Sequence, residues 1–148
     1  MPSIFSRIVA GEIPCHKVWE DEHHLAFLDI RPVAPGHTLV IPKREVDYLF
    51  DLSPAEYGAL WEAVRRVEAK IQARMGCERV IVTVMGWEVP HVHVHLVPTD
   101  NPGQFPLPAP CGMDKDAIAA LAARFQDAPR PQAEPVLERT IDEAVEDE

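Results

Sequence analysis

The alternation of apolar and polar residues predicts five short strands and three helices. Two-residue alternation is typical of a strand with one buried face, whereas spacings of three and four residues are typical of a helix. Strands are expected at residues 16–20, 25–29, 37–41, 80–85 and 91–97. Helices are expected at residues 4–9, 53–75 and 114–125. The order α-β-β-β-α-β-β-α, with mostly short connections, indicates an α+β fold around an antiparallel sheet.

Local signals mark the ends of these elements. Ser53 begins a capping box that ends at Glu56, with proline at the first helical position, and Gly76 supplies the stop. Ser3 is expected to cap the first helix. Two prolines and a glycine make residues 30–36 a loop, and Pro42 is expected to stop the third strand. The short link between the last two strands predicts an antiparallel hairpin.

Composition and charge narrow the class of protein. The 148 residues are 47% hydrophobic and carry a formal charge of −10, which argues against sequence-independent binding of nucleic acid. Residues 127–148 hold eight carboxylates against two arginines, or −6. We expect a domain over residues 1–126 and an acidic, proline-containing tail over 127–148 that is disordered or loosely docked. Without a signal-peptide core or a membrane span, a cytoplasmic location is expected. Three widely spaced cysteines indicate reduced thiols.

Residues 90–98 contain three histidines that alternate with apolar residues. Because successive side chains of a strand point to opposite faces, we expect His91, His93 and His95 on one face and their apolar neighbours in a core. Buried imidazoles need hydrogen-bond partners, so burying three of them side by side costs free energy and is unexpected unless they have a function. The row therefore indicates a chemical site.

Three interpretations of the row stay open from the residues alone. A divalent metal accepts histidine ligands, but three such positions span about 13 Å, so one ion needs a further ligand such as Glu88 or His37. A neutral imidazole also attacks phosphorus or an acyl carbon when an acceptor holds its other nitrogen, and flanking histidines then donate hydrogen bonds. The third interpretation is a hydrogen-bonded ladder without chemistry.

The run His-Val-His-Val-His-Leu-Val at residues 91–97 resembles the motif of the histidine triad (HIT) nucleotide hydrolases and transferases. The likeness extends over about residues 3–98 in the same order and overlaps most with the Hint-like bacterial branch. It is carried further by residues 3–5, 11–14, 19–21, 26–30 and 35–43. The fold it implies is a five-stranded antiparallel sheet with one long helix and short N- and C-terminal helices, which makes residues 1–126 a HIT domain.

The resemblance implies a role for each histidine. His93 matches the nucleophile, which attacks the α-phosphorus of a nucleotide derivative and forms a covalent nucleotidyl-histidine that water resolves. His95 is expected to contact the phosphate oxygens, and the backbone carbonyl of His91 to fix the tautomer of His93. His37 matches the fourth histidine of the cluster. The resemblance implies no cofactor and no metal for the covalent step.

The resemblance also assigns nucleotide-binding residues. Asp29 matches the carboxylate that receives the ribose hydroxyls, with a turn cap at the strand end as the structural alternative. Six apolar residues match the wall around the purine base, with ordinary core packing as their alternative: Ile4, Phe5, Ile8, Ile13, Phe27 and Ile30. The implied substrates are purine nucleoside phosphoramidates or dinucleoside polyphosphates, and the implied assembly is a homodimer joined edge to edge. A nucleotide-binding regulatory module and, less favoured, a histidine-ligated metal enzyme are the alternatives.

Two departures from the family pattern concern the phosphate side and a zinc site. The loop before the motif is short, with Trp87 at the usual glutamine, Glu88 at the usual hydroxyl and Thr83 near the missing asparagine. Glu88 is then a proton donor, an orienter of His95 or a solvent-facing residue. Many bacterial relatives also hold zinc with a Cys-x-x-Cys pair, where this chain has Ser3 and Ser6, and Arg44-Glu45-Val46 replaces a further histidine. Hydroxyls are poor zinc ligands, so no structural zinc is expected.

Overall fold

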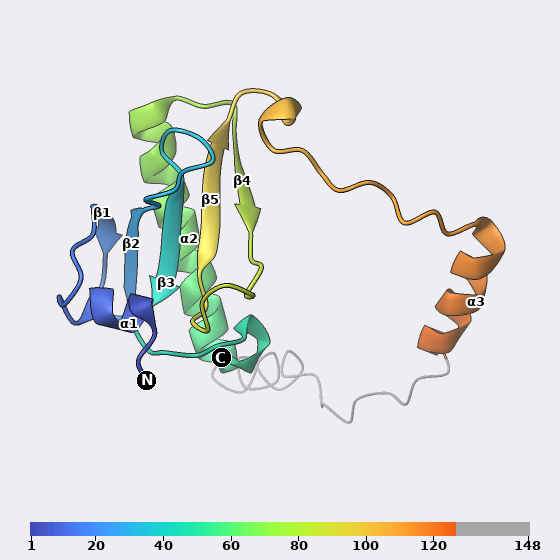
Figure 1. The fold of residues 1–148 in the computed structure, drawn as a ribbon, viewed down its shortest axis with the longest axis horizontal. Helices are drawn as coiled ribbons and strands as arrows, with labels where there is room; N and C mark the ends of the chain where they lie inside the picture. Colours follow the sequence, from blue (N-terminus) through green and yellow to red (C-terminus); the bar gives the residue numbers. More distant parts are fainter. Residues whose placement is uncertain (127–148) are drawn as a thin grey trace, which may run out of the picture. The chain divides into compact units, whose positions relative to one another are not determined.

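Five strands form one antiparallel sheet in the order β1-β2-β3-β5-β4 (Figure 1). The computed structural model describes residues 1–126, so the acidic tail expected at 127–148 lies outside the described residues. The strands are β1 (Lys17–Glu20), β2 (His24–Leu28), β3 (Thr38–Pro42), β4 (Arg79–Thr83) and β5 (Val94–Thr99). The helices are α1 (Ile4–Val9), α2 (Pro54–Met75) and α3 (Lys115–Gln126), with short 3-10 turns η1 (Leu49–Asp51) and η2 (Pro102–Gln104). The predicted fold class and element order are confirmed.

The predicted capping signals act where they were expected. Ser53 accepts a hydrogen bond from the backbone N–H of Glu56, whose side chain accepts one from the backbone of Ser53. At the other end of α2, Gly76 adopts φ 63°, a left-handed conformation that glycine enters without steric cost. Ser3 caps α1 by accepting from the backbone N–H of Ser6. The caps therefore fix both helices at the residues the sequence indicates.

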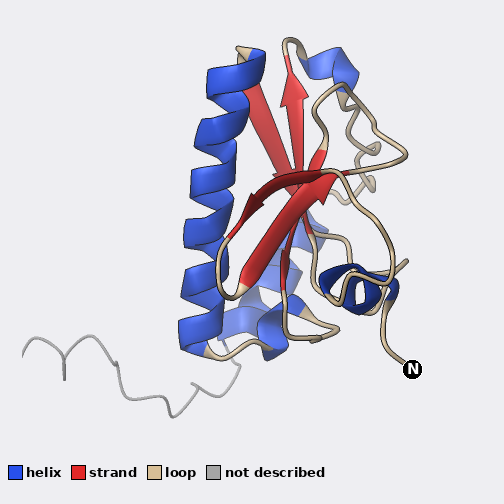
Figure 2. Cartoon of the chain, turned by 90° about the vertical axis from the view of Figure 1, so that its left-hand side faces the viewer, coloured by secondary structure: helices blue, strands red, loops and turns tan. Residues whose placement is uncertain are grey.

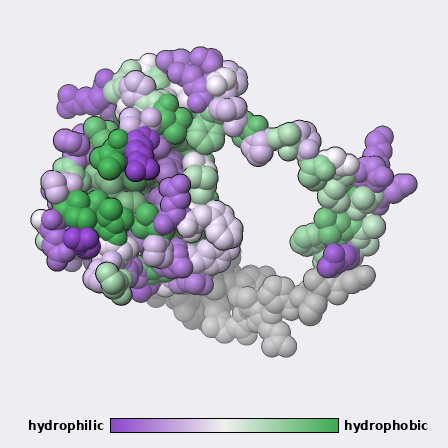
Figure 3. Space-filling model, viewed as in Figure 1, coloured by the Kyte–Doolittle hydropathy of each residue, from purple (hydrophilic) through white to green (hydrophobic). Residues whose placement is uncertain are grey.

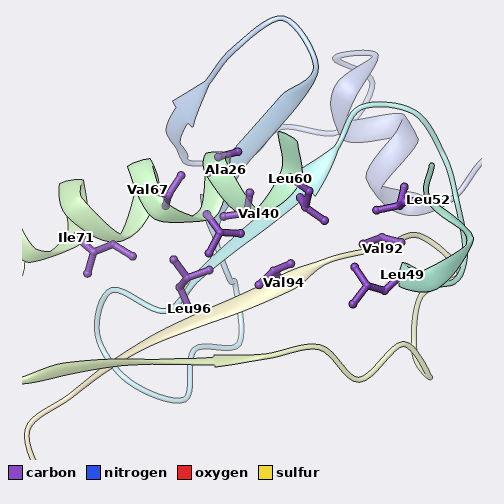
Figure 4. Close-up of a cluster of buried hydrophobic side chains, with 12 residues drawn as sticks. Ala26, Val40, Leu49, Leu52, Leu60, Val67, Ile71, Val92, Val94 and Leu96 are labelled. Carbon is purple, nitrogen blue, oxygen red and sulfur yellow. The ribbon is translucent and has the colours of Figure 1, made fainter. Parts of the chain in front are cut away.

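The long helix α2 covers one face of the sheet (Figure 2). Its buried side chains recur at helical spacing and include Leu60, Val64 and Val67. They pack against alternate residues of the strands, among them Val40 and Val94, which are fully buried (Figure 4). This apolar layer is the main core of the domain and holds the central strands β3 and β5 in place.

The short helix α1 lies on the opposite face of the sheet (Figure 2). Phe5 is its buried anchor and packs with residues that alternate with those of the main core: Leu25, Phe27, Leu39 and Ile41. The alternation between the two clusters is the strand periodicity seen in three dimensions. The face under α1 is less completely covered than the α2 face, which leaves room for a cleft.

The structure corrects the strand expected at residues 91–97. β5 begins at Val94, so His91 and His93 precede the strand and only His95 belongs to it. The backbone N–H groups before β5 bond elsewhere: that of His91 donates to the carbonyl of Val89, and that of Val92 to the carbonyl of Val46. The chain bends there and does not join the sheet until Val94, because loop residues supply the backbone partners.

Other boundaries differ by a few residues. Pro42 is the last residue of β3, opposite His24, rather than the residue that stops it. β4 ends at Thr83, two residues before the predicted end.

Contacts divide the chain into two units after Leu107. The helix α3, which is exposed along its length, belongs to the second unit, and the expected domain boundary at residue 126 stays a prediction. In residues 1–126, no helix has the length and apolar content needed to cross a membrane.

Replacing Leu60 tests the main core. Leu60 is fully buried between α2 and the sheet, so Leu60→Ala removes buried methyl groups and leaves a cavity. We expect the free energy of unfolding to fall by about 3 kcal/mol in a denaturant titration. Leu107→Ala is the matched control, because Leu107 is 83% exposed, and an equal loss in both variants would contradict this assignment of the core.

Candidate functional site

Four histidines gather on the α1 side of the sheet. The ring centroids of His93 and His95 lie 5.1 Å apart, and those of His95 and His37 lie 5.2 Å apart. The ring of Phe5 stands edge-on to both His91, at 5.8 Å, and His93, at 5.0 Å. The side chains thus share one side of the chain as predicted, although only one of the three in the row lies in a strand.

His93 is held by the backbone of His91. Its Nδ1 lies 2.7 Å from the carbonyl oxygen of His91, and a carbonyl only accepts hydrogen bonds. Nδ1 of His93 therefore carries the proton, and Nε2 keeps its lone pair in the neutral ring. His93 also lines a cleft, so a nitrogen with nucleophilic character faces a space that a ligand can enter. The contact expected between these two histidines is present.

His91 lies behind the cleft and is fully buried. Its Nε2 donates to the carbonyl oxygen of Pro42, at 2.8 Å. Its Nδ1 is 2.7 Å from the hydroxyl oxygen of Ser3, which donates to it because the ring's proton is on the other nitrogen. Both ring nitrogens are thus satisfied, and burial lowers the pKa of His91.

His37 and His95 form a chain of hydrogen bonds that starts at the backbone. The N–H of Val33 donates to Nδ1 of His37, at 3.0 Å, which puts the proton of His37 on Nε2. That Nε2 lies 2.9 Å from Nδ1 of His95 and donates to it. His95 consequently carries its own proton on Nε2. The outcome is an N–H donor on His95 beside the lone pair of His93.

Burial keeps these rings neutral near pH 7. Desolvation is the main cause that lowers the pKa of His95 to about 4, and repulsion from His93 and His37 acts in the same direction. Desolvation also lowers the pKa of His37, against an opposing pull from Asp29. Neutral rings fit the hydrogen-bond chain, in which His37 accepts from Val33 and donates to His95.

Asp29 stands at the end of β2 beside this chain. Its Oδ1 accepts from the backbone N–H of Arg31, at 2.8 Å, and its Oδ2 lies 3.6 Å from Nε2 of His37. The turn cap considered as an alternative for Asp29 is therefore present, and it leaves Oδ2 turned toward the histidines. The carboxylate both shapes the loop and borders the site.

Asp29, His37 and His95 also offer three possible metal-ligand atoms within 4.8 Å of one another. The hydrogen bonds argue against a metal at this trio. Nε2 of His37 carries a proton as long as Val33 donates to Nδ1, and Nδ1 of His95 accepts a hydrogen bond from this Nε2–H. Binding an ion would require His37 to change tautomer and break both bonds, so this donor set fits a hydrogen-bonded chain better than a metal.

A mostly apolar cleft of about 180 Å³ opens between α1 and the sheet. It brings together ten of the predicted site residues: Ile4, Phe5, Ile8, Ile13, Phe27, Asp29, Ile30, Glu88, His93 and His95. Figure 3 shows apolar side chains gathered on this face, over α1 and the neighbouring strands. Phe5 and Phe27 are buried, whereas Ile4 and Ile30 are exposed at the rim, so the wall combines core residues with accessible ones.

A second cleft of about 270 Å³ adjoins the first and contains the predicted residues His37 and Thr83. Asp29, Glu88 and His95 line both clefts, so they stand at the junction. Thr83 lies in β4 directly opposite His95, away from the apolar cleft. His91 lines neither cleft and supports the site from behind.

Several lining residues were not predicted. Leu39 lies in the first cleft, and its place in an alternating strand was a usable signal. Val89 also lines that cleft, and Arg31, Met85 and Phe105 line the second. They lie in loops or just beyond strand ends, where sequence periodicity gives no direction for a side chain. The backbone N–H of Val33, which orients His37, left no sequence signal.

The neutral histidines predict a stability that depends on pH. Because folding lowers the pKa of His37, His91 and His95, the unfolded chain takes up protons at a pH where the folded chain does not. The free energy of unfolding should therefore be full above the ordinary value of 6.5 and fall as pH drops from about 7 to about 5. Each histidine contributes less than about 1.4 kcal/mol per pH unit to this change in the free energy of unfolding. The contribution of half-buried His95 is reduced further by solvent screening.

Denaturant titrations across this range measure the effect. His95→Gln should flatten the dependence, whereas His23→Gln, at an exposed histidine outside the cluster, should leave it unchanged. A free energy of unfolding that stays constant, or rises, as the pH falls would contradict neutral buried rings.

Comparison with known proteins agrees with this geometry. The family model described as the HIT domain matches residues 10–102. "Protein hit" of Bacillus subtilis is 36% identical over 107 residues, which cover 68% of this chain and 72% of that protein. The crystal structure of a member of the HIT family from Bacillus subtilis superposes with a TM-score of 0.76 at 28% identity, and covers 89% of this chain and 100% of that one.

A further structure is named a HIT family hydrolase, from Legionella pneumophila. It is 37% identical, with a TM-score of 0.56, and the match covers 65% of this chain and 91% of that one. The family model spans more than half of the sequence and includes three of the clustered histidines in order, together with His37. The chain belongs to the HIT domain family.

Proposed function

We propose that this protein is a nucleotide hydrolase that cleaves purine nucleoside phosphoramidates or dinucleoside polyphosphates at the α-phosphate through His93. The observation that carries the proposal is the 2.7 Å hydrogen bond from Nδ1 of His93 to the carbonyl of His91. It leaves the Nε2 lone pair available at a cleft, which is what a nucleophilic imidazole needs.

The apolar cleft is suited to a purine base. Its wall is largely aliphatic and aromatic, and Asp29 at its border has a carboxylate oxygen available for ribose hydroxyls. A nucleoside placed in this way has its 5′ side toward His93 and His95. The second cleft then takes the leaving group, because it shares the three junction residues Asp29, Glu88 and His95 with the first.

The proposed reaction has two displacements. The Nε2 lone pair of His93 forms a bond to the α-phosphorus while the bond from phosphorus to the leaving atom breaks, and the leaving atom takes that electron pair. A leaving amine also takes a proton from water in the open second cleft, and the hydroxide that remains is neutralised by the proton released in the second displacement; a leaving phosphate departs as an anion. Water then attacks the phosphorus, Nε2 regains its lone pair, and a nucleoside monophosphate and a proton are released.

The neighbouring groups stabilise this path. The N–H at Nε2 of His95 donates to a phosphate oxygen as charge develops, and a desolvated donor is effective there. When His93 is phosphorylated its ring is cationic, and the carbonyl of His91 stabilises that cation through the same Nδ1 hydrogen bond. These steps use groups of the chain and water, and no metal ion takes part in them.

The proposed assembly is a homodimer in the cytoplasm, joined through sheet edges. β4 is an edge strand with exposed Val82, and an unpaired edge is a surface on which a second copy can pair. The small-molecule partner is the nucleotide substrate, and the net negative charge disfavours nucleic acid as a partner.

Replacing His93 tests the nucleophile. We expect His93→Ala to lower turnover of adenosine 5′-phosphoramidate by at least about 1,000-fold, because the covalent path is lost. Binding of AMP should remain, and rapid quenching of the parent should trap an adenylyl group on His93. His16→Ala is the control, at a histidine outside the cluster.

Three results would contradict the proposal. Unchanged turnover in His93→Ala would refute the nucleophile. AMP binding by the parent without turnover of the phosphoramidate or of diadenosine tetraphosphate would favour a regulatory module. Loss of activity with a chelator, restored by one metal ion, would favour the metal enzyme.

Glu88 is proposed to select the leaving group. The junction and second cleft carry the carboxylates Asp29 and Glu88 against Arg31, and among the described residues that line the apolar cleft none is Lys or Arg. A polyphosphate leaving group meets repulsion there, whereas an uncharged amine does not.

Removing the charge of Glu88 tests whether this residue discriminates between the two classes of leaving group. Glu88→Gln should raise kcat/KM for diadenosine tetraphosphate by about five-fold, the effect of removing a repulsion of about 1 kcal/mol at a solvent-exposed site. The phosphoramidate should change little. Glu62→Gln, on α2 across the sheet, is the control, and an unaltered ratio between the two substrates in Glu88→Gln would show that Glu88 does not discriminate.

A further inference from the structure

A polar cluster lies where α1 begins, outside both clefts. Four side chains meet there: Ser3, Ser6, Glu45 and His91. Ser3 and Ser6 come from the start of α1, Glu45 from the loop after β3, and His91 from the segment before β5. We name the first three the N-terminal clasp, because they connect three separate parts of the chain around one buried imidazole.

Ser3 is the centre of the clasp. Its hydroxyl oxygen accepts from the backbone N–H of Ser6, at 2.9 Å, and its proton goes to Nδ1 of His91, at 2.7 Å. Ser3 is buried, with an exposed fraction of 6%, so these bonds do not compete freely with water. One hydroxyl thus caps α1 and fixes the orientation of His91.

Glu45 ties the loop after β3 to the same helix start. Its Oε1 accepts from the backbone N–H of Ser3 and, at 2.9 Å, from the hydroxyl of Ser6. The backbone N–H of Ser3, followed by the hydroxyl of Ser6, holds the pKa of Glu45 below its usual value. The side chain is therefore a carboxylate at neutral pH, and it closes the clasp from the solvent side.

The end of β3 and the loop after it, which carries Glu45, also hold the segment around His91. The carbonyl of Pro42 accepts from Nε2 of His91, and the carbonyl of Val46 accepts from the backbone N–H of Val92. Separate hydrogen bonds therefore fix the ring of His91 and the backbone next to it. Together they determine where the carbonyl oxygen of His91 lies. That oxygen is the acceptor for Nδ1 of His93.

The clasp does not suit the structural zinc that the family resemblance implies for many bacterial relatives. The proton of Ser3 is used toward His91 and that of Ser6 toward Glu45, so both side chains are neutral hydroxyls, and a hydroxyl is a poor zinc ligand beside a thiolate. The same groups instead satisfy one another through hydrogen bonds. The hydroxyl of Ser3 connects α1 directly to His91.

We propose that Ser3, Ser6 and Glu45 are positioning residues that act through His91 to hold the nucleophilic nitrogen of His93 in line with the substrate, a role that rests on the proposed hydrolase function. α1 also carries Ile4, Phe5 and Ile8 of the base-binding wall, so the clasp sets the distance between the bound base and the nucleophile. A small displacement of a reacting group lowers the rate of a covalent step more than it weakens binding.

Three variants and one control test this role. Ser3→Ala removes the donor to His91, Ser3→Thr keeps the hydroxyl, and Glu45→Ala removes an exposed carboxylate. Glu12→Ala is the matched control, because Glu12 is an exposed carboxylate paired with Arg7 at the other end of α1. Thermal unfolding verifies that each variant is folded.

The kinetic readout is the single-turnover rate of adenylyl transfer to His93 from adenosine 5′-phosphoramidate. Ser3→Ala should lower this rate by about ten-fold and Glu45→Ala by about three-fold, the effects of one hydrogen bond and of a weaker exposed one. The Kd for AMP should change by less than about two-fold. Ser3→Thr should restore most of the rate, and Glu12→Ala should match the parent.

A second readout needs no turnover. The proton resonance at Nδ1 of His93 reports its hydrogen bond to His91, and it should shift or broaden in Ser3→Ala and Glu45→Ala but not in Glu12→Ala. Parental rates and an unchanged resonance in folded Ser3→Ala, or in Glu45→Ala if Ser3→Ala does not fold, would overturn the proposal. If the parent turns over no substrate, the hydrolase proposal fails, and the resonance still decides whether the clasp orients His93.

Discussion

The hydrogen bond from Nδ1 of His93 to the carbonyl of His91 determines what the histidine cluster can do. A neutral imidazole can place its proton on either nitrogen, and only one choice leaves a lone pair facing the cleft. A backbone carbonyl can only accept a hydrogen bond and a backbone N–H can only donate one, so these groups determine which ring nitrogen carries the proton. The carbonyls of His91 and Pro42 and the N–H of Val33 fix three rings, and His37 then fixes His95. The site is in this sense specified by the path of the main chain.

The two faces of the sheet have different roles: one forms the main core, and the other borders the cleft. The α2 face is packed with fully buried aliphatic side chains such as Leu60 and Val40, which hold the central strands rigidly. The α1 face carries a smaller cluster around Phe5 and leaves a cleft beside it. Phe5 connects this smaller cluster to the histidines, because its ring packs on Phe27 and also contacts the rings of His91 and His93. The helix that forms part of the cleft is thereby connected directly to the nucleophile.

Much of this arrangement was predictable from the sequence. Ser53 and Gly76 mark the long helix because caps act locally, and alternation predicts the strands because burial has a period of two. The side shared by the three histidines also followed from alternation. That His91 and His93 precede β5 did not, because the backbone N–H groups of His91 and Val92 bond to loop residues that periodicity does not describe. The placement of Thr83 away from the apolar cleft likewise depends on where β4 pairs with β5.

The tautomers of the four histidines provide the most direct test of this account. A two-bond proton–nitrogen correlation spectrum of the protein with 15N-labelled histidine, recorded near neutral pH, distinguishes a protonated ring nitrogen from one with a lone pair. The account predicts Nδ1–H with a free Nε2 for His93, and Nε2–H for His37, His91 and His95. An Nε2–H tautomer of His93 would contradict it.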